Sequence, residues 1–382
     1  MIKLCLYLFG LSFCTLSFTS LRAFNVLGVS EVSIFLSLVL LIILKGKKLL
    51  ILSGHRLLDT YWLIFISLLT VTLFFAELSG ISYIGKSYHD YFAFLFCFLV
   101  VITFSNLCKI FGLNEVLRVT VRFSFIATFF LIFLYPVLKG GVSDLFVIRY
   151  SGLSHNPNQL ALYSIFSLYI SIYHFISTST RKEKLISLLL SFLSVVLGFL
   201  SISDAFLLSF STFLLLFIGY QVLLNLLKPV GILRKSVSFF CLIFISLASS
   251  IVFGRVLNGL IGMSEENGQG SVRFTLWRHG FEAMLESPIF GLGPGAWSGL
   301  DYPIQGHEAH NSYIDFGNSF GFLGILMMAI LIFYNISKLK RENYIYLIFS
   351  LFSLLVFGVF HYILRFPFTW VILSVPFFIR AK

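Results

Sequence analysis

The chain has 382 residues, of which 58% are hydrophobic and only 11% are charged. A soluble domain averages roughly a quarter charged residues and just under half apolar ones, so this composition excludes a soluble globular fold. The formal net charge of +11 does not indicate nucleic-acid binding, because the lysines and arginines lie in short clusters between apolar runs, as in membrane proteins. We therefore expect an all-α integral membrane protein, with residues 1–382 forming a single polytopic domain.

Apolar runs long enough to cross a bilayer follow one another along most of the chain. The start resembles a secretory signal, but a second apolar run follows at once, so we expect an uncleaved first helix. The sequence predicts about twelve transmembrane helices, near residues 4–21, 25–44, 57–78, 91–107, 123–138, 158–178, 185–202, 205–224, 236–253, 311–335, 343–360 and 363–379.

The distribution of positive charge predicts a side for each connection. With the N-terminus in the cytoplasm, most of the 27 lysines and arginines fall in cytoplasmic connections, as the positive-inside rule requires. Both termini are then cytoplasmic. Residues 139–157 and 254–310 fall on the other side, the second as one large loop between the ninth and tenth spans. Arginines in these two loops go against the charge bias, which indicates that they have a function.

The first candidate site lies where Arg149 precedes the turn Asn156-Pro157-Asn158. The turn leads into a predicted helix, for which Asn156 is a candidate N-cap. Backbone N–H groups at a helix N-terminus, together with a nearby guanidinium group, form an anion site. The alternative is a capped loop whose arginine only reaches toward the membrane surface, and the spacing leaves both interpretations open.

The second candidate site lies in a predicted helix that carries Arg273, Trp277 and Arg278. Arg273 and Trp277 share one helical face, whereas Arg278 is turned away from Trp277 by about 100°. A tryptophan beside arginines can stack on a sugar ring while the guanidinium groups hold phosphate. The alternative is a tryptophan that only anchors the helix at the membrane surface.

The third candidate site is the sequence His307-Glu308-Ala309-His310-Asn311 at the start of an apolar run. His-x-x-His spacing suits a metal, but no third ligand is evident and the order differs from that of metallopeptidases. A histidine at the mouth of a membrane helix is better suited to act as a general base, because its pKa lies near neutrality. His310 is the first choice for this role and His307 the second.

These motifs together resemble the O-antigen ligase/polymerase superfamily of bacterial polysaccharide assembly (the Wzy/WaaL type). The resemblance rests on the following features, in chain order: Arg149, Gly152 and Asn156-Pro157-Asn158 before a span; Arg273-x-x-x-Trp277, then Pro288-x-x-Gly291-x-Gly293; and His310-Asn311-x-Tyr313, then Gly321 and Gly324. One departure lies at residues 201–205, Ser-Ile-Ser-Asp-Ala, where many relatives carry an arginine that this chain lacks.

The resemblance implies a GT-C-like membrane glycosyltransferase that needs no metal and no other cofactor. Its donor would be a glycan on undecaprenyl pyrophosphate, and its acceptor a sugar hydroxyl at the periplasmic face of the bacterial inner membrane. Guanidinium groups would stabilise the departing pyrophosphate. The candidate catalytic residues are His310, Arg273 and Arg149, and the candidate substrate-binding residues are Arg278, Trp277, His307, Asn156, Asn158, Asn311 and Tyr313.

Three functions compete on this basis. A polymerase would add the glycan to another lipid-linked repeat unit, whereas a ligase would pass the finished chain to lipid A–core. The chain is lean in alanine and rich in phenylalanine, isoleucine and lysine, as in AT-rich polysaccharide gene clusters, which favours the polymerase, with a Wzz-type chain-length regulator as a candidate partner. A lipid-linked sugar transporter is the third interpretation, disfavoured because most ionisable residues lie at the ends of spans rather than in mid-membrane.

Overall fold

The computed structural model describes residues 1–23, 27–46, 55–80, 84–138, 149–227, 231–265, 269–299, 306–341 and 344–379. These residues form helices and no β-strand, apart from an isolated backbone bridge between Ala23 and Leu27. Eight of their helices are long and apolar enough to cross a membrane. The expected class, an all-α integral membrane protein, is therefore confirmed.

The elements are α1 (Ile2–Thr15), η1 (Thr19–Leu21), α2 (Val29–Lys45), α3 (Arg56–Leu78), α4 (Ile84–Phe111), α5 (Leu113–Phe133), α6 (Tyr135–Leu138), α7 (Pro157–Ser177), α8 (Arg181–Leu200), α9 (Asp204–Leu227), α10 (Ile232–Glu265), α11 (Gln269–Glu286), α12 (Ser312–Arg341), α13 (Ile345–Phe360), α14 (Pro367–Ser374) and η4 (Val375–Phe378). Each of the twelve predicted apolar runs overlaps one of these helices. The eight that are long enough to span are α3, α4, α5, α7, α8, α9, α10 and α12. The count of twelve spans, and the side on which each connection lies, stay predictions.

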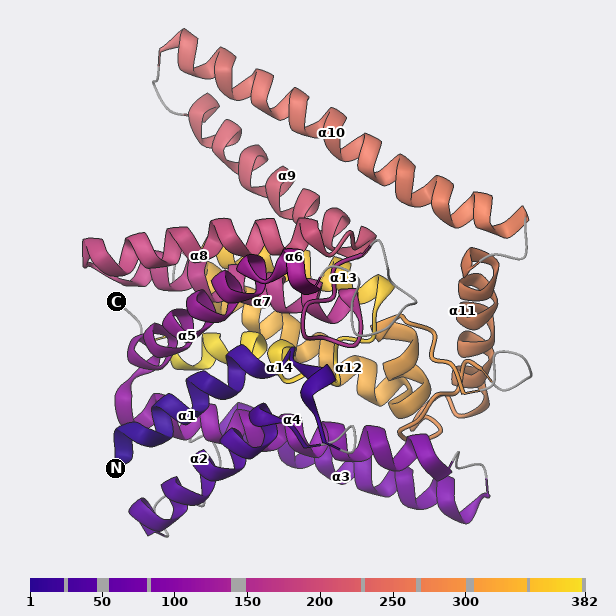
Figure 1. Cartoon of the computed structure of the whole chain (residues 1–382). Coiled ribbons are helices and arrows are strands. Elements are labelled where there is room, and N and C mark those ends of the chain that lie inside the picture. The colour runs from indigo at the N-terminus through magenta and orange to yellow at the C-terminus, as the bar shows by residue number, and fades with distance from the viewer. Residues whose placement is uncertain are drawn as a thin grey trace.

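Two parts of the bundle differ in how deeply they are enclosed. Helix α7 packs against α5, α8, α13 and α14, and its Leu160, Tyr163 and Phe166 are fully buried. Helices α9 and α10 instead form a hairpin in which α9 packs against α13, whereas α10 contacts α9 and α11 and stands off from the rest of the bundle (Figure 1). Side chains such as Phe240, Phe244 and Ile251 of α10 are exposed. In a bilayer the acyl chains cover such surfaces, so their exposure carries no aqueous cost there.

The predicted large loop, residues 254–310, contains regular structure. Helix α10 continues to Glu265, helix α11 follows, and residues 291–299 then return to pack inside the bundle. Trp297 is almost completely buried, and its indole N–H donates to the Gly293 carbonyl at 2.6 Å. Residues 266–268 and 300–305 of this loop, and residues 139–148 of the other predicted outer loop, lie outside the described residues.

Helix α12 is interrupted where the segment Pro288–Gly293 packs against it. In an unbroken helix, the N–H groups of Phe322 and Leu323 would donate to the carbonyls of the residues four positions earlier. Here they donate to the Pro288 and Ile289 carbonyls, at 2.7 and 3.2 Å. The carbonyls of Asn318 and Ser319 accept from the N–H groups of Leu292 and Gly293 instead, at 2.7 and 3.0 Å. The adjoining segment therefore supplies partners for these four backbone groups.

Two glycines make this exchange sterically feasible. Gly321 has φ 60° and ψ −160° inside α12, and Gly291 has φ 76°. A Cβ on Gly291 would lie 2.4 Å from the backbone N of Phe320, and one on Gly321 would lie 2.5 Å from the Ile289 carbonyl carbon. Because unpaired backbone groups are costly within a bilayer, the break persists only where another backbone approaches this closely. We call this contact the glycine seam (Pro288–Gly293 with Asn318–Leu323).

Candidate active site

Arg149 is held just before α7 by two neighbours. Its Nη2 donates to Asn158 Oδ1 at 2.9 Å, and its Nε donates to the Ser201 carbonyl at 3.4 Å. The Ser203 hydroxyl donates to the same Asn158 oxygen at 2.9 Å. Asn158 thus connects Arg149 to the turn between α8 and α9, which is the segment where the sequence departs from the superfamily pattern.

Asn156 caps α7, as its sequence predicts. Its Oδ1 accepts from the N–H of Asn158 at 2.8 Å, and Pro157 occupies the first turn, where its missing N–H costs nothing. The candidate capping role is confirmed. The side-chain oxygens of Asn156 and Asn158 both have partners within the protein, so these residues shape the loop that carries Arg149.

Helix α11 directs its two arginines differently. The Trp277 indole N–H donates to the Ala309 carbonyl at 2.9 Å, while Arg273, four residues earlier, is half-buried. Arg278 is exposed, and its Nε lies 3.9 Å from Glu282 one turn on. Arg273 and Trp277 therefore share the face that meets the segment 307–311, and Arg278 lies on another face.

The backbone on both sides of His310 is fixed by one carboxylate. Asp315 accepts from the N–H of Ala309 at 2.8 Å and from the N–H of Asn311 at 3.1 Å. His310 lies between these two amides with φ 52°, which is uncommon for a residue other than glycine, and its side chain is exposed. The segment thus holds the histidine in one strained conformation.

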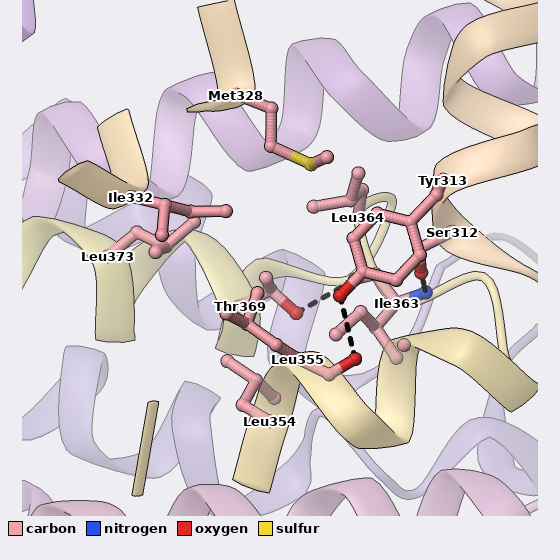
Figure 2. Close-up of a pocket in the computed structure, with 11 residues that line it drawn as sticks. Ser312, Tyr313, Met328, Ile332, Leu354, Leu355, Ile363, Leu364, Thr369 and Leu373 are labelled. Atoms are coloured by element: carbon pink, nitrogen blue, oxygen red, sulfur yellow. Dashed lines mark hydrogen bonds between the residues drawn. The ribbon is translucent and has the colours of Figure 1, made fainter. Parts of the chain in front are cut away.

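The remaining candidates near α12 have varied surroundings. Asn311 Oδ1 caps α12, accepting from the N–H groups of Tyr313 at 3.0 Å and Ile314 at 3.3 Å. The hydroxyl of Tyr313 donates to the Leu355 carbonyl at 2.7 Å, inside an apolar pocket between α12, α13 and α14 (Figure 2). His307 is exposed, three residues before His310. The structure therefore engages the Asn311 side-chain oxygen in capping α12 and the Tyr313 hydroxyl in a contact with α13.

A second histidine, His361, lies opposite His310. Their ring centroids are 6.4 Å apart. Ser312 fixes the turn after α13 that carries it: the Ser312 hydroxyl donates to the His361 carbonyl at 2.6 Å and accepts from the Ile363 N–H at 2.9 Å. The sequence analysis missed His361, although one signal was present. A histidine lies between the last two apolar runs and an arginine near the start of the last one, on the side predicted for the other candidates.

Electrostatic effects show that four groups from distant segments lie near one another, and we call them the Arg–His cluster (Arg149, Arg273, His310 and His361). Burial is the main cause that lowers the pKa of the His361 imidazole, and the charges of Arg273, His310 and Arg149 lower it further. Desolvation likewise lowers the pKa of His310; Glu308 opposes this, while Arg273 and Arg365 add to it. Both imidazoles are therefore neutral at pH 7 and free to accept a proton.

The two arginines of the cluster are also close to each other. Burial lowers the pKa of Arg149 and of Arg273, and the carboxylate of Asp204 opposes the shift at both. The charge of Arg273 lowers the pKa of Arg149 further. A guanidinium group stays protonated in spite of such shifts. The cluster is therefore a half-buried, positively charged site at which a bound anion would relieve the repulsion between the two guanidinium groups.

No group of three or more histidine, cysteine or acidic side chains suited to a metal ion occurs in the described ranges of the chain. The residues around His310 engage one another instead: Glu308 pairs with Arg365, and Asp315 accepts from backbone amides. Metal independence stays a prediction.

Residues 186–329 match a family model described as Wzy_C, O-antigen ligase. The matched range contains the turn before α9, helix α11 and the segment 307–311, so it includes Arg273 and His310. Arg149 precedes this range and His361 follows it. No curated protein matches the chain. The match confirms the resemblance to the O-antigen ligase/polymerase superfamily.

Proposed function

From a chain that carries an O-antigen ligase family domain at residues 186–329, we infer a membrane glycosyltransferase of polysaccharide assembly, and we propose that it is a polymerase. The donor would be a glycan on undecaprenyl pyrophosphate, and the acceptor a sugar hydroxyl of another lipid-linked repeat unit. One observation carries this proposal: the arginines and histidines of the Arg–His cluster come from four segments far apart in sequence and lie near one another, and the Asp204 carboxylate acts on both arginines.

The proposed reaction divides the work between the two kinds of side chain. The acceptor hydroxyl oxygen forms a bond to the anomeric carbon of the donor sugar and gives its proton to the His310 imidazole. The bond from that carbon to the pyrophosphate oxygen breaks, and the lipid pyrophosphate leaves with the electron pair. Arg149 and Arg273 stabilise the charge that develops on the phosphate oxygens.

The electrostatics of His310 suit this role. A base must be neutral before it accepts a proton, and the surroundings of His310 hold its pKa below the ordinary histidine value. Because the pKa is lowered, the neutral form persists to more acidic pH. Loss of activity on acidification is therefore expected at a pH below the ordinary histidine pKa of about 6.5.

The polyprenyl tail of the donor would lie against the α9–α10 hairpin. Helix α10 runs to Glu265, close to the start of α11, and α11 carries Arg273. Exposed apolar side chains of α10, among them Phe240 and Phe244, provide a lipid-facing surface along this helix, and the C-terminal end of α10 lies beside α11 (Figure 1). We expect the active site at the periplasmic face of the bacterial inner membrane, with both termini cytoplasmic and a chain-length regulator as a further partner.

The alternative is a ligase that transfers the finished glycan to lipid A–core, and the description of the matched family favours it. Lipopolysaccharide from a deletion strain separates the two. Loss of a polymerase leaves core carrying one repeat unit, whereas loss of a ligase leaves bare core while lipid-linked polymer accumulates. Re-expression of the wild-type chain should restore the ladder, and re-expression of the His310→Ala variant should not. An unchanged ladder in the deletion strain contradicts both functions.

A further inference from the structure

We propose that Arg365, in the turn between α13 and α14, is a positioning residue that holds His310 in its reactive place through Glu308. The proposal rests on the function inferred above. It gives the pair Arg365–Glu308 a role in the reaction rather than in folding alone.

The first support is the geometry of a buried ion cluster. The Arg365 guanidinium donates with both terminal nitrogens to the Glu308 carboxylate, Nη1 to Oε1 and Nη2 to Oε2, the second at 2.8 Å. Its Nη1 also donates to Asp90 Oδ1 of α4 at 2.9 Å. The side chains of Asp90 and Glu308 are 2% and 8% exposed. Such a two-pronged contact fixes the direction of Glu308 as well as its distance.

The second support is the way in which the segment around His310 is held. Asp315 fixes the amides of Ala309 and Asn311, and Trp277 fixes the carbonyl of Ala309. These contacts act on the backbone between 309 and 311. Arg365 acts two residues before His310, on the side chain of Glu308 rather than on the backbone. The positive φ of His310 is uncommon, so its persistence requires fixed neighbours on both sides.

Stability alone gives a poor reason for this arrangement. A buried ion pair loses as much in desolvation as it gains in attraction, and apolar side chains of similar volume often serve as well or better. Here one guanidinium group faces two carboxylates, so negative charge is in excess. Such a cluster can instead orient a side chain, which apolar packing cannot do. Only the planar guanidinium group can donate to both oxygens of a carboxylate at once.

The third support is that the pair acts on the charge state of His310. Glu308 raises the His310 pKa, and Arg365 lowers it. The other groups that face His310 are Arg273 from α11, His307 from its own segment and His361 from the opposite turn. Neutralising Glu308 and neutralising Arg365 must therefore shift His310 in opposite directions, whereas two changes that only loosen the fold would have no reason to do so.

Chemical modification measures this directly. Diethyl pyrocarbonate reacts with neutral imidazole, so the pH dependence of His310 modification, followed on its own peptide by mass spectrometry, gives its pKa without an activity assay. Arg365→Gln should move the midpoint upward and Glu308→Gln should move it downward, each by about half a pH unit or more. The double variant should return close to the wild-type midpoint. Shifts in the same direction, or no shift in either variant, would overturn the proposal.

Two further variants complete the test. Glu115→Gln removes a carboxylate that pairs with Arg118 on α5 and should leave the His310 midpoint unchanged. Arg365→Lys keeps the charge but loses the fork, so the midpoint should hold while the elongation rate falls about tenfold or more; an undiminished rate would contradict positioning by the fork. Should Arg365→Gln not accumulate in membranes, Glu308→Gln alone decides, because its midpoint either falls or does not.

The elongation assay, with His310→Ala as its reference, keeps this proposal distinct from the proposed function. If purified wild-type protein fails to elongate lipid-linked repeats, the function is wrong, while the modification midpoints still report on the Arg365–Glu308 pair. If the wild type elongates, His310→Ala does not, and the Arg365 and Glu308 variants keep both the wild-type rate and the wild-type midpoint, then only the positioning role fails.

Discussion

Two segments reach α12 from the same long connection, and they are fixed by different means. The segment 308–311 is held by side chains: Asp315, Trp277 and Arg365 each contact it from a separate element. The glycine seam is held by backbone groups alone, through four exchanged hydrogen bonds. The first arrangement can be changed one contact at a time, whereas the second depends on two backbones that touch.

The two kinds of contact predict different tolerance to substitution. A side-chain contact contributes a modest amount, about 1 kcal/mol for a neutral hydrogen bond, and its loss leaves the remaining contacts in place. A Cβ in the glycine seam displaces the backbone itself and leaves several polar groups unpaired, each costly in an apolar environment. The seam therefore determines whether α12 forms, and the side-chain contacts determine how precisely the segment 308–311 is positioned.

The largest effect is expected from Gly291→Ala. Its Cβ would lie 2.4 Å from the Phe320 N, and its backbone has a positive φ. We expect a loss of stability of roughly 3 kcal/mol or more, and little folded protein in membranes. Gly219→Ala is the matched control, because a Cβ there meets nothing within 4 Å. Thermal unfolding in detergent compares the two, and a Gly291→Ala melting curve like that of Gly219→Ala would break the distinction.

Next in size is His310→Ala, which tests the other segment. The substitution removes the proposed base and leaves the contacts of Asp315 and Trp277 to the backbone intact. Polysaccharide ladders should disappear, while the protein level and melting temperature stay near those of the wild type. Ladders of normal length in this variant would remove the catalytic role of His310. A strong drop in melting temperature would assign the residue to folding instead.

A smaller effect is expected when the two arginines of α11 are exchanged for lysine. Arg273 is half-buried and belongs to the Arg–His cluster, whereas the Arg278 side chain is 70% exposed and its Nε lies 3.9 Å from the Glu282 carboxylate. Arg273→Lys should reduce elongation about tenfold or more, since a point charge lacks the planar fork that grips phosphate. Arg278→Lys should stay within about twofold of the wild type. Equal rates for both variants would mean that the helix face does not matter.

The smallest effect is expected from Trp277→Phe, which removes one side-chain contact of the segment 308–311. The indole N–H that donates to the Ala309 carbonyl is lost, and the aromatic packing is largely kept. We expect a loss of about 1 kcal/mol in stability and a several-fold loss of activity. Melting curves and elongation rates measure the two. A loss of stability as large as that of Gly291→Ala would show that this side-chain contact matters as much to folding as the glycine seam does.

Much of the fold follows from apolar periodicity, because membrane helices must satisfy their own backbone. All twelve predicted runs overlap helices, and the sequence correctly identifies Asn156 as a cap. The interruption of α12 was beyond such reasoning. Gly321 in an apolar run reads as a small residue for close packing, and only the arrival of Gly291 from 30 residues earlier shows that the helix is broken there.

The candidate site could be predicted only in part. Motif spacing selected Arg149, Arg273 and His310, which the structure brings into one cluster. It also selected Tyr313 and Asn311, whose polar groups serve internal packing. His361 escaped because a single histidine in a short connection has no spacing pattern. Its relevance appears only when the last connection folds back against the segment 307–311.

The glycine seam has a consequence for local opening of the structure. The amide protons of Phe322 and Leu323 belong to α12 by position, but their acceptors are Pro288 and Ile289. Their deuterium uptake should therefore follow transient detachment of the segment Pro288–Gly293 from α12, not fraying of the helix. A ligand that clamps α11 against the bundle would slow exchange at these two amides, so isotope labelling there would register substrate engagement from a distance.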